Sequence, residues 1–137
     1  MIFVDTSALY AVLDRSDANH AAAKAQWSGL MQGNALLLVS NYVLIEIATL
    51  VQNRLGMEAL RALCDEVVPV FAIHWITEVE HNQATHAVLS ANRRQLSLVD
   101  CSSFQVMRQR GLRTAFAFDP HFGEQGFELL PVRRRRH

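Results

Sequence analysis

The feature that most constrains the fold of this chain is an alternation of short apolar runs with longer segments of helical character. The apolar runs have the length of strands, and capping residues or glycines stand at the ends of the segments between them. The predicted strands are Met1–Val4, Ala35–Val39, Val67–Phe71, Arg113–Phe118 and Phe127–Leu130. The predicted helices are Ala8–Leu13, Ala18–Leu30, Asn41–Leu55, Met57–Glu66, Trp75–Asn92 and Ser97–Arg110. This order predicts an α/β fold, a three-layer sandwich with a central, mainly parallel sheet flanked by helices.

Several residues predict where these elements begin and end. Ser16 and Asp17 are candidate caps for the second helix, and Ser40 and Asn41 are candidate caps for the third. Gly56 predicts the end of that third helix. Pro69 lacks a backbone donor, so we expect its strand to lie at an edge of the sheet.

The composition is that of a folded domain. Hydrophobic residues make up 50% of the chain and charged residues 19%, which excludes a disordered chain and allows a sizeable core. No apolar run approaches the roughly 18 residues that a membrane-spanning helix needs. The two cysteines are too few for a disulfide framework and favour a reduced compartment. We therefore expect one domain over residues 1–132, no membrane contact, and a cytoplasmic location.

The net charge of zero hides an uneven distribution of charge. Four of the 13 basic residues form the run Arg133–Arg136, which leaves nine basic and 13 acidic residues before it. We assign residues 133–137 to a basic C-terminal tail. This tail either holds phosphate by electrostatic attraction or is a solvated end of the chain, and its charge does not decide between the two.

Three aspartates stand at boundaries between predicted elements. Asp5 and Asp119 each follow an apolar strand, and Asp100 lies three residues after Ser97. Singly, each predicts only a helix cap or a capping box. Jointly they predict more, because ligands of parallel sheets bind beyond the carboxyl ends of the strands. If the strands before Asp5 and Asp119 are neighbours, these two carboxylates share one crevice.

Glu46 is a carboxylate in the largely apolar stretch 42–48, where no helix cap needs it. One interpretation places it in the same acidic site. The other places it on a solvent-facing helix surface with Tyr42, Thr49 and Asn53, at i, i+4 and i+7 spacing. Both interpretations stay open at this point.

Carboxylates that lie together repel one another unless a cation is supplied. Mg²⁺ and Mn²⁺ are hard cations that prefer carboxylate and water ligands. Such a site activates a water molecule and neutralises charge on a phosphodiester in the transition state. Asp5, Glu46, Asp100 and Asp119 therefore suggest a metal-dependent phosphoryl-transfer site.

The motifs around these four acids resemble those of PIN-domain ribonucleases, specifically the VapC-type toxins of bacterial toxin–antitoxin pairs. Each motif is short, but together they occur in the order and spacing of that family over nearly the whole chain. The segments that carry the resemblance are 1–9, 40–46, 96–104, 115–122 and 126–131.

This resemblance implies that residues 1–132 are a single PIN-like nuclease domain that cleaves RNA by a metal-activated water, leaving a 5′-phosphate and a 3′-hydroxyl. Asp5 and Asp100 would be the principal ligands of Mg²⁺, or of Mn²⁺, with Glu46 and Asp119 completing the cluster. The hydroxyls of Thr6 and Ser102 would support these ligands. The resemblance also implies inhibition by an antitoxin protein that fills the groove, and a homodimer.

A noncatalytic PIN-fold module that binds RNA or a partner is the alternative, against which the four intact acids argue. Two residues beside the acids invite other interpretations. His121 either contacts the scissile phosphate or, as we favour, is a surface histidine at the start of a helix. Cys101 is expected to be a buried apolar residue and not a nucleophile, because no histidine is paired with it by the sequence pattern.

Overall fold

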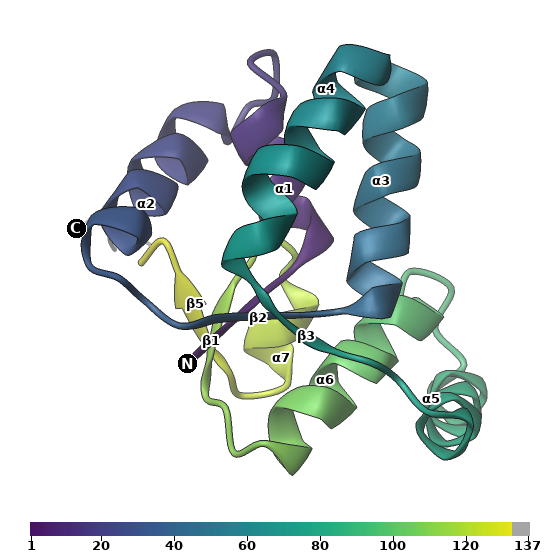
Figure 1. Ribbon diagram of the computed structural model, residues 1–137. Helices are drawn as coiled ribbons and strands as arrows, with labels where there is room; N and C mark the ends of the chain where they lie inside the picture. Colours follow the sequence, from purple (N-terminus) through teal and green to yellow (C-terminus); the bar gives the residue numbers. More distant parts are fainter. Residues whose placement is uncertain (133–137) are drawn as a thin grey trace.

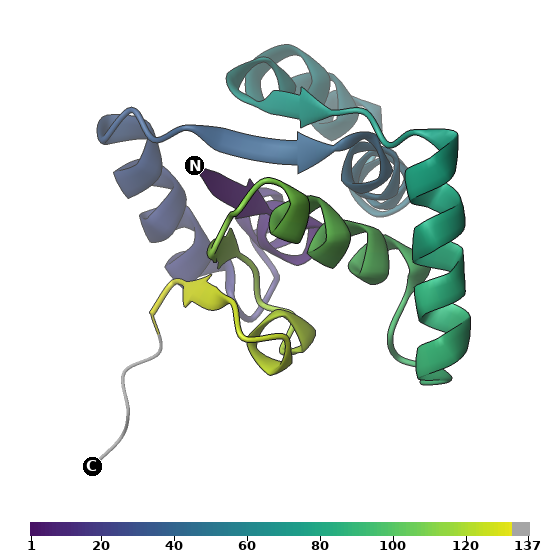
Figure 2. The same cartoon turned by 90° about the horizontal axis from the view of Figure 1, so that it is seen from below.

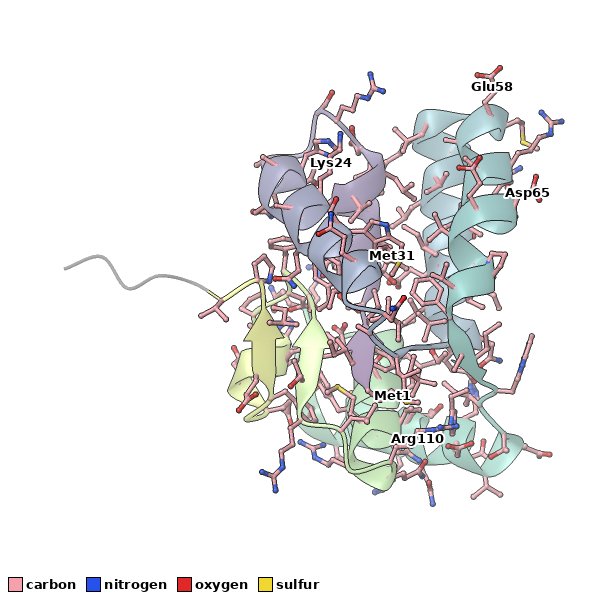
Figure 3. The ribbon with its side chains drawn as sticks, turned by 60° about the vertical axis from the view of Figure 1, so that its left-hand side comes forward. Met1, Lys24, Met31, Glu58, Asp65 and Arg110 are labelled. Atoms are coloured by element: carbon pink, nitrogen blue, oxygen red, sulfur yellow. The ribbon has the colours of Figure 1, made fainter. Side chains whose placement is uncertain are left out.

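Five short parallel strands form the central sheet of the computed structural model, which describes residues 1–132. They lie in the order β3-β2-β1-β4-β5, and every neighbouring pair is parallel. Figure 3 shows that the arrowheads of β1, β4 and β5 point the same way. The strands are β1 (Ile2–Val4), β2 (Leu37–Ser40), β3 (Ala72–His74), β4 (Thr114–Phe116) and β5 (Glu128–Leu130). The predicted α/β class is confirmed, and the sheet is wholly parallel. The basic tail predicted at 133–137 lies outside the described residues.

Two groups of helices cover the sheet (Figure 1), and the view from below places α5, α6 and α7 nearer the viewer than α1, α3 and α4 (Figure 2). The three layers of the sandwich are therefore helices, sheet and helices, as predicted. The helices are α1 (Thr6–Leu13), α2 (His20–Gln32), α3 (Asn41–Leu55), α4 (Met57–Ala62), α5 (Glu78–Ala91), α6 (Leu98–Gln109) and α7 (His121–Glu124).

β1 is the first strand in the sequence and lies at the centre of the sheet. Phe3 pairs with Leu38 of β2 on one side and with Ala115 of β4 on the other, and all three side chains are fully buried. A strand buried on both faces has to be apolar throughout, which is why Phe3 and Val4 precede Asp5 without a polar residue between them. The neighbouring position of β1 and β4 meets the condition for Asp5 and Asp119 to share one crevice.

The third strand differs from its prediction. Residues 67–71 are not a strand: Val68–Val70 form a 3-10 helix, η2, with Pro69 in its first turn, and β3 begins only at Ala72. Proline has a fixed φ and no N–H, so it suits the first turn of a helix better than a strand. β3 is an edge strand, as expected, but Pro69 lies outside it.

Several helix boundaries also differ from the sequence predictions: α1 begins at Thr6 and α5 at Glu78, for example. The helix predicted over residues 57–66 is regular only to Ala62 and continues as a π-helical turn, η1 (Leu63–Val67). The second helix has Asn19 as its N-cap. Asp17 instead accepts the backbone N–H of Asn19 at 2.8 Å in the turn before the helix, which explains why it does not cap the helix itself.

Among residues 1–132, no helix is long and apolar enough to cross a membrane.

Candidate active site

Asp5 begins the site at the carboxyl end of β1. Its backbone N–H donates to the carbonyl of Phe116 at 3.0 Å, which extends the pairing of β1 with β4 by one residue. Its side chain caps α1 by accepting the backbone N–H of Ser7, as predicted for an N-cap. The residue is only 3% exposed, so the sheet and α1 together hold this carboxylate away from water.

The hydroxyl of Ser7 joins the two strand ends that carry aspartates. It donates to Oδ2 of Asp5 at 2.6 Å and accepts the backbone N–H of Phe118 at 2.9 Å. Phe118 immediately precedes Asp119, so one hydroxyl ties the Asp5 carboxylate to the segment that carries Asp119. The sequence analysis considered the hydroxyls of Thr6 and Ser102 and missed that of Ser7. Its position two residues after an N-cap aspartate was the signal that was available, because such residues commonly meet the capping side chain.

Asp100 reaches the site from the first turn of α6. It forms the predicted capping box with Ser97: the Ser97 hydroxyl accepts the N–H of Asp100 at 3.0 Å, and Oδ2 of Asp100 accepts the N–H of Ser97 at 3.0 Å. These two hydrogen bonds fix the rotamer of the carboxylate, which is 8% exposed. A capping role and a role in the site are therefore compatible for the same side chain.

Asp119 lies between β4 and α7, and His121 is the first residue of α7. Oδ1 of Asp119 accepts the backbone N–H of His121 at 2.9 Å. Nδ1 of His121 lies 2.8 Å from Oδ1 of Asp119 and 3.8 Å from Oδ2 of Asp100, and the side chain is only 13% exposed. The prediction of a surface histidine is therefore wrong. Phe122 explains why: it is fully buried and packs on Phe3 and Phe104, which draws the start of α7 against the sheet.

The electrostatics of the cluster oppose full ionisation. The pKa of Asp5 is raised to about 7: burial is the largest cause, the charges of Asp100 and Asp119 add to it, and the hydrogen bonds from Ser7 oppose it. Burial also raises the pKa of Asp100, and Asp119 adds to that effect. Within the part of the chain that the structure describes, no lysine or arginine forms an ion pair with these carboxylates, and the basic side chain beside Asp100 and Asp119 is the imidazole of His121. Three carboxylates held together in this way are short of positive charge.

The donor atoms suit a small divalent cation. One ligand atom from each of Asp100, Asp119 and His121 lies within 4.8 Å of the other two. Asp5 is close enough to Asp100 and Asp119 for their charges to raise its pKa. Mg²⁺ and Mn²⁺ prefer carboxylate oxygens, and the acidic side chains of this cluster outnumber the basic ones. The residues present therefore fit such an ion.

The other predicted residues contribute less to this geometry. Glu46 is half-buried in the second turn of α3, which starts at the carboxyl end of β2, and no hydrogen bond or ion pair joins it to the aspartates. Its place in the cluster stays a prediction. Ser102 donates to the carbonyl of Val99 within its own helix, whereas the Thr6 hydroxyl is buried and has no hydrogen-bond partner in residues 1–132. Cys101 is buried, as expected, and burial raises the pKa of its thiol.

Comparisons with known proteins find similar proteins over nearly the whole chain. A family model described as "PIN domain" matches residues 2–128. The 23S rRNA-specific endonuclease VapC20 of Mycobacterium tuberculosis is 36% identical over 133 residues, which are 96% of this chain and 99% of that protein. The crystal structure of Mycobacterium tuberculosis VapC20, described as a sarcin–ricin-loop-cleaving toxin, has a TM-score of 0.83 at 34% identity and covers 98% of this chain and 100% of its own.

Two further solved structures share the fold at lower identity. FitAcB from Neisseria gonorrhoeae has a TM-score of 0.68 at 17% identity, covering 94% of this chain and 96% of its own. PAE2754 from Pyrobaculum aerophilum has a TM-score of 0.64 at 18% identity, covering 94% and 88%. At these identities the likeness concerns the fold alone.

Proposed function

Because this chain belongs to the PIN-domain family, we propose that it is a metal-dependent endoribonuclease and the toxic component of a toxin–antitoxin pair. In this proposal residues 1–132 form one nuclease domain, and the protein acts in the cytoplasm, where its RNA substrate is found. The close full-length relative supports the endonuclease activity, since that protein is named an rRNA-specific endonuclease.

One observation carries the proposal: Asp5, Asp100 and Asp119 converge at the carboxyl edge of the sheet although 114 residues separate the first from the last. Each has a local capping role, but capping alone does not require that they meet. Their meeting raises the pKa of Asp5 and costs the metal-free protein stability. Carboxylates with raised pKa values cluster at functional sites. Binding a cation is the function that these three carboxylates suit.

When bound, a divalent cation acts as a Lewis acid. It offsets negative charge on the phosphodiester and activates water as the nucleophile. Asp5 and Asp100 would be its principal ligands, and Asp119 and Glu46 would complete the cluster. Ser7 fixes the distance between the ends of β1 and β4, and Ser97 fixes the rotamer of Asp100. The sheet and α1 exclude water from Asp5, which strengthens its interaction with a cation. Hydrolysis leaves a 5′-phosphate and a 3′-hydroxyl.

The substrate that we propose is ribosomal RNA, because the relative with 36% identity is specific for 23S rRNA. An exposed loop would suit an enzyme of this kind, since single-stranded bases are accessible to proteins in a way that paired bases are not. The partners that we propose are a cognate antitoxin protein, which would cover the acidic cluster, and a second copy of this chain in a homodimer.

The test is cleavage of intact ribosomes and of total RNA by the purified protein, with primer extension to map the ends. We expect discrete fragments with Mg²⁺ or Mn²⁺ and none with EDTA. Asp5→Asn should lower the cleavage rate at least about 100-fold, because it removes a charge that neutralises the transition state and keeps the shape of the side chain. The matched control is Asp65→Asn, which makes the same change at an exposed carboxylate on η1 that points away from the protein in Figure 3.

Three outcomes would contradict the proposal. Cleavage that survives both EDTA and Asp5→Asn, in protein shown to be free of other ribonucleases, would mean that the acids are wrongly assigned. RNA binding without cleavage in any metal, by protein shown to be free of antitoxin, would favour the noncatalytic module. Equal losses from Asp5→Asn and Asp65→Asn would show that the acidic cluster has no special role.

A further inference from the structure

Nδ1 of His121 is a buried nitrogen whose hydrogen-bonding capacity is not used. It has no hydrogen-bond partner among residues 1–132, although Oδ1 of Asp119 lies only 2.8 Å away. That oxygen is already the acceptor of the backbone N–H of His121. A buried polar atom without a partner costs free energy. A ligand that contacts both this nitrogen and the carboxylate oxygen beside it would remove that cost.

One separation in this group matches an edge of a coordination octahedron, and the separation from Asp100 is longer by less than 1 Å. Ligand bonds of 2.0–2.1 Å to a small cation place adjacent ligand atoms about 3 Å apart. Nδ1 of His121 is 2.8 Å from Oδ1 of Asp119 and 3.8 Å from Oδ2 of Asp100. All three ligand atoms lie within 4.8 Å of one another. A single ion between them can therefore contact one nitrogen and two oxygens with little movement of the side chains.

The nitrogen is also held in place before any ion arrives. His121 is the first residue of α7, and the next residue, Phe122, is fully buried. The ring of Phe122 packs against those of Phe3 in β1 and Phe104 in α6, the helix that also carries Asp100. The same aromatic cluster thus positions both the histidine and one of its carboxylate neighbours, which is the preorganisation that a metal ligand needs.

We propose that Nδ1 of His121 is a direct ligand of the divalent cation in this site, and that this nitrogen makes the site prefer Mn²⁺ to Mg²⁺. The inference rests on the proposed metal-dependent function and specifies its ion. Mg²⁺ is a hard ion that favours oxygen and keeps its waters, whereas first-row transition metals gain more from an imidazole nitrogen. A cluster of carboxylates alone would have no imidazole nitrogen through which to favour Mn²⁺ over Mg²⁺.

The test measures ion binding and not catalysis. Untagged, metal-free protein is titrated with Mn²⁺ and with Mg²⁺ by calorimetry, and the bound Mn²⁺ is examined by pulsed electron paramagnetic resonance for coupling to a nitrogen nucleus. We expect the protein to bind Mn²⁺ at least about tenfold more tightly than Mg²⁺ and to show a nitrogen coupling that changes when histidine is labelled with ¹⁵N.

His121→Asn removes the imidazole, and we expect it to abolish the coupling and to lower Mn²⁺ affinity about tenfold, with a smaller effect on Mg²⁺. His121→Asp should bring the affinities for the two ions closer together, because it makes the ligand set all-oxygen. His86→Asn is the matched control, since His86 is exposed on α5 and should leave coupling and affinities unchanged. Circular dichroism of each variant shows whether it folds.

Mn²⁺ bound without nitrogen coupling, or coupling that persists in His121→Asn, would overturn the role of His121. The proposed nuclease would then stand on an all-oxygen site and on its own cleavage test. No Mn²⁺ or Mg²⁺ binding at millimolar concentration would overturn both the ligand assignment and the metal dependence. Binding that Asp5→Asn leaves unchanged would place the ion outside this cluster and would also overturn the assignment.

Discussion

The hydroxyl of Ser7 donates a 2.6 Å hydrogen bond to Oδ2 of Asp5, and the same oxygen of Ser7 accepts the backbone N–H of Phe118. The serine therefore does more than complete a helix cap. It couples the position of one carboxylate to the chain segment that leads into Asp119, so both its polar contacts serve the geometry of the site.

Ser7→Ala should destabilise the protein and weaken the site together. The N–H of Phe118 loses its acceptor, which costs about 1–3 kcal/mol for a buried group. The pKa of Asp5 rises further, since the lost hydrogen bond favours its ionised form. Urea unfolding and Mn²⁺ titration measure the two effects, and we expect a loss of affinity of roughly 10–100-fold. Ser28→Ala, at an exposed site on α2, is the control; equal behaviour of the two variants would contradict the role of Ser7.

The stability of the metal-free protein should fall as the pH rises from about 4 to 7. Asp5 keeps its proton in the folded protein until about pH 7, whereas the unfolded chain releases it near its ordinary value of 3.8. Between these values the folded state binds more protons, so raising the pH favours unfolding, by at most about 1.4 kcal/mol per pH unit.

Urea unfolding in EDTA at pH 5 and pH 7 checks this dependence, for the natural protein and for Asp5→Asn. The two proteins differ only at position 5, so the difference between their pH dependences reports on Asp5. The natural protein should lose more stability than the variant over this range. Identical losses would mean that Asp5 ionises normally in the folded protein.

Asp100 caps a helix and contributes charge to the site, and two substitutions should separate these roles. Asp100→Asn keeps an oxygen that can accept the N–H of Ser97, so we expect a change in stability below about 1 kcal/mol and a loss of cleavage of about 100-fold or more. Asp100→Ala should lose the same activity and about 1 kcal/mol more stability. Thermal unfolding and the ribosome cleavage assay provide the readouts. A cleavage-competent Asp100→Asn would remove Asp100 from the ligand set.

Glu46→Gln tests the one acidic residue that no contact joins to the others. If Glu46 completes the cluster, as proposed, cleavage should fall at least about tenfold while the unfolding temperature stays within about 2 °C, because the substitution preserves shape and the site is half-exposed. Glu58→Gln, on an exposed face of α4, is the matched control. Unchanged cleavage in Glu46→Gln would favour the interpretation of a solvent-facing helix surface.

The order of strands and helices could be predicted because each apolar run is short and is bounded by a residue with a clear local effect. Ser40 and Ser97 cap the first turns of α3 and α6, and Gly56 ends α3. The structure confirms all three boundaries. Pro69 misled the prediction because an apolar run around a proline fits an edge strand and a 3-10 turn equally well. The choice depends on where the chain enters the sheet, which is not a local property.

The site was predictable to the extent that it depends on strand ends. Asp5 and Asp119 follow apolar strands, so their meeting required only that β1 and β4 be neighbours. The burial of His121 depends instead on the packing of Phe122 against the rings of Phe3 and Phe104, which are far from it in the sequence. No periodic pattern near His121 predicts that burial. The role of Ser7 depends on the N–H of Phe118, which is 111 positions away in the chain. Contacts of this kind arise only once the sheet has formed.

The central position of β1 has a consequence for the timing of activity in the cell. Synthesis delivers β1 first, but Asp5 and Ser7 reach their final partners only when Phe116 and Phe118 have arrived. A chain still growing on the ribosome therefore carries isolated carboxylates and no assembled cluster until position 119 has emerged. We therefore expect a nascent chain that ends before position 119 to lack any activity that depends on the assembled cluster.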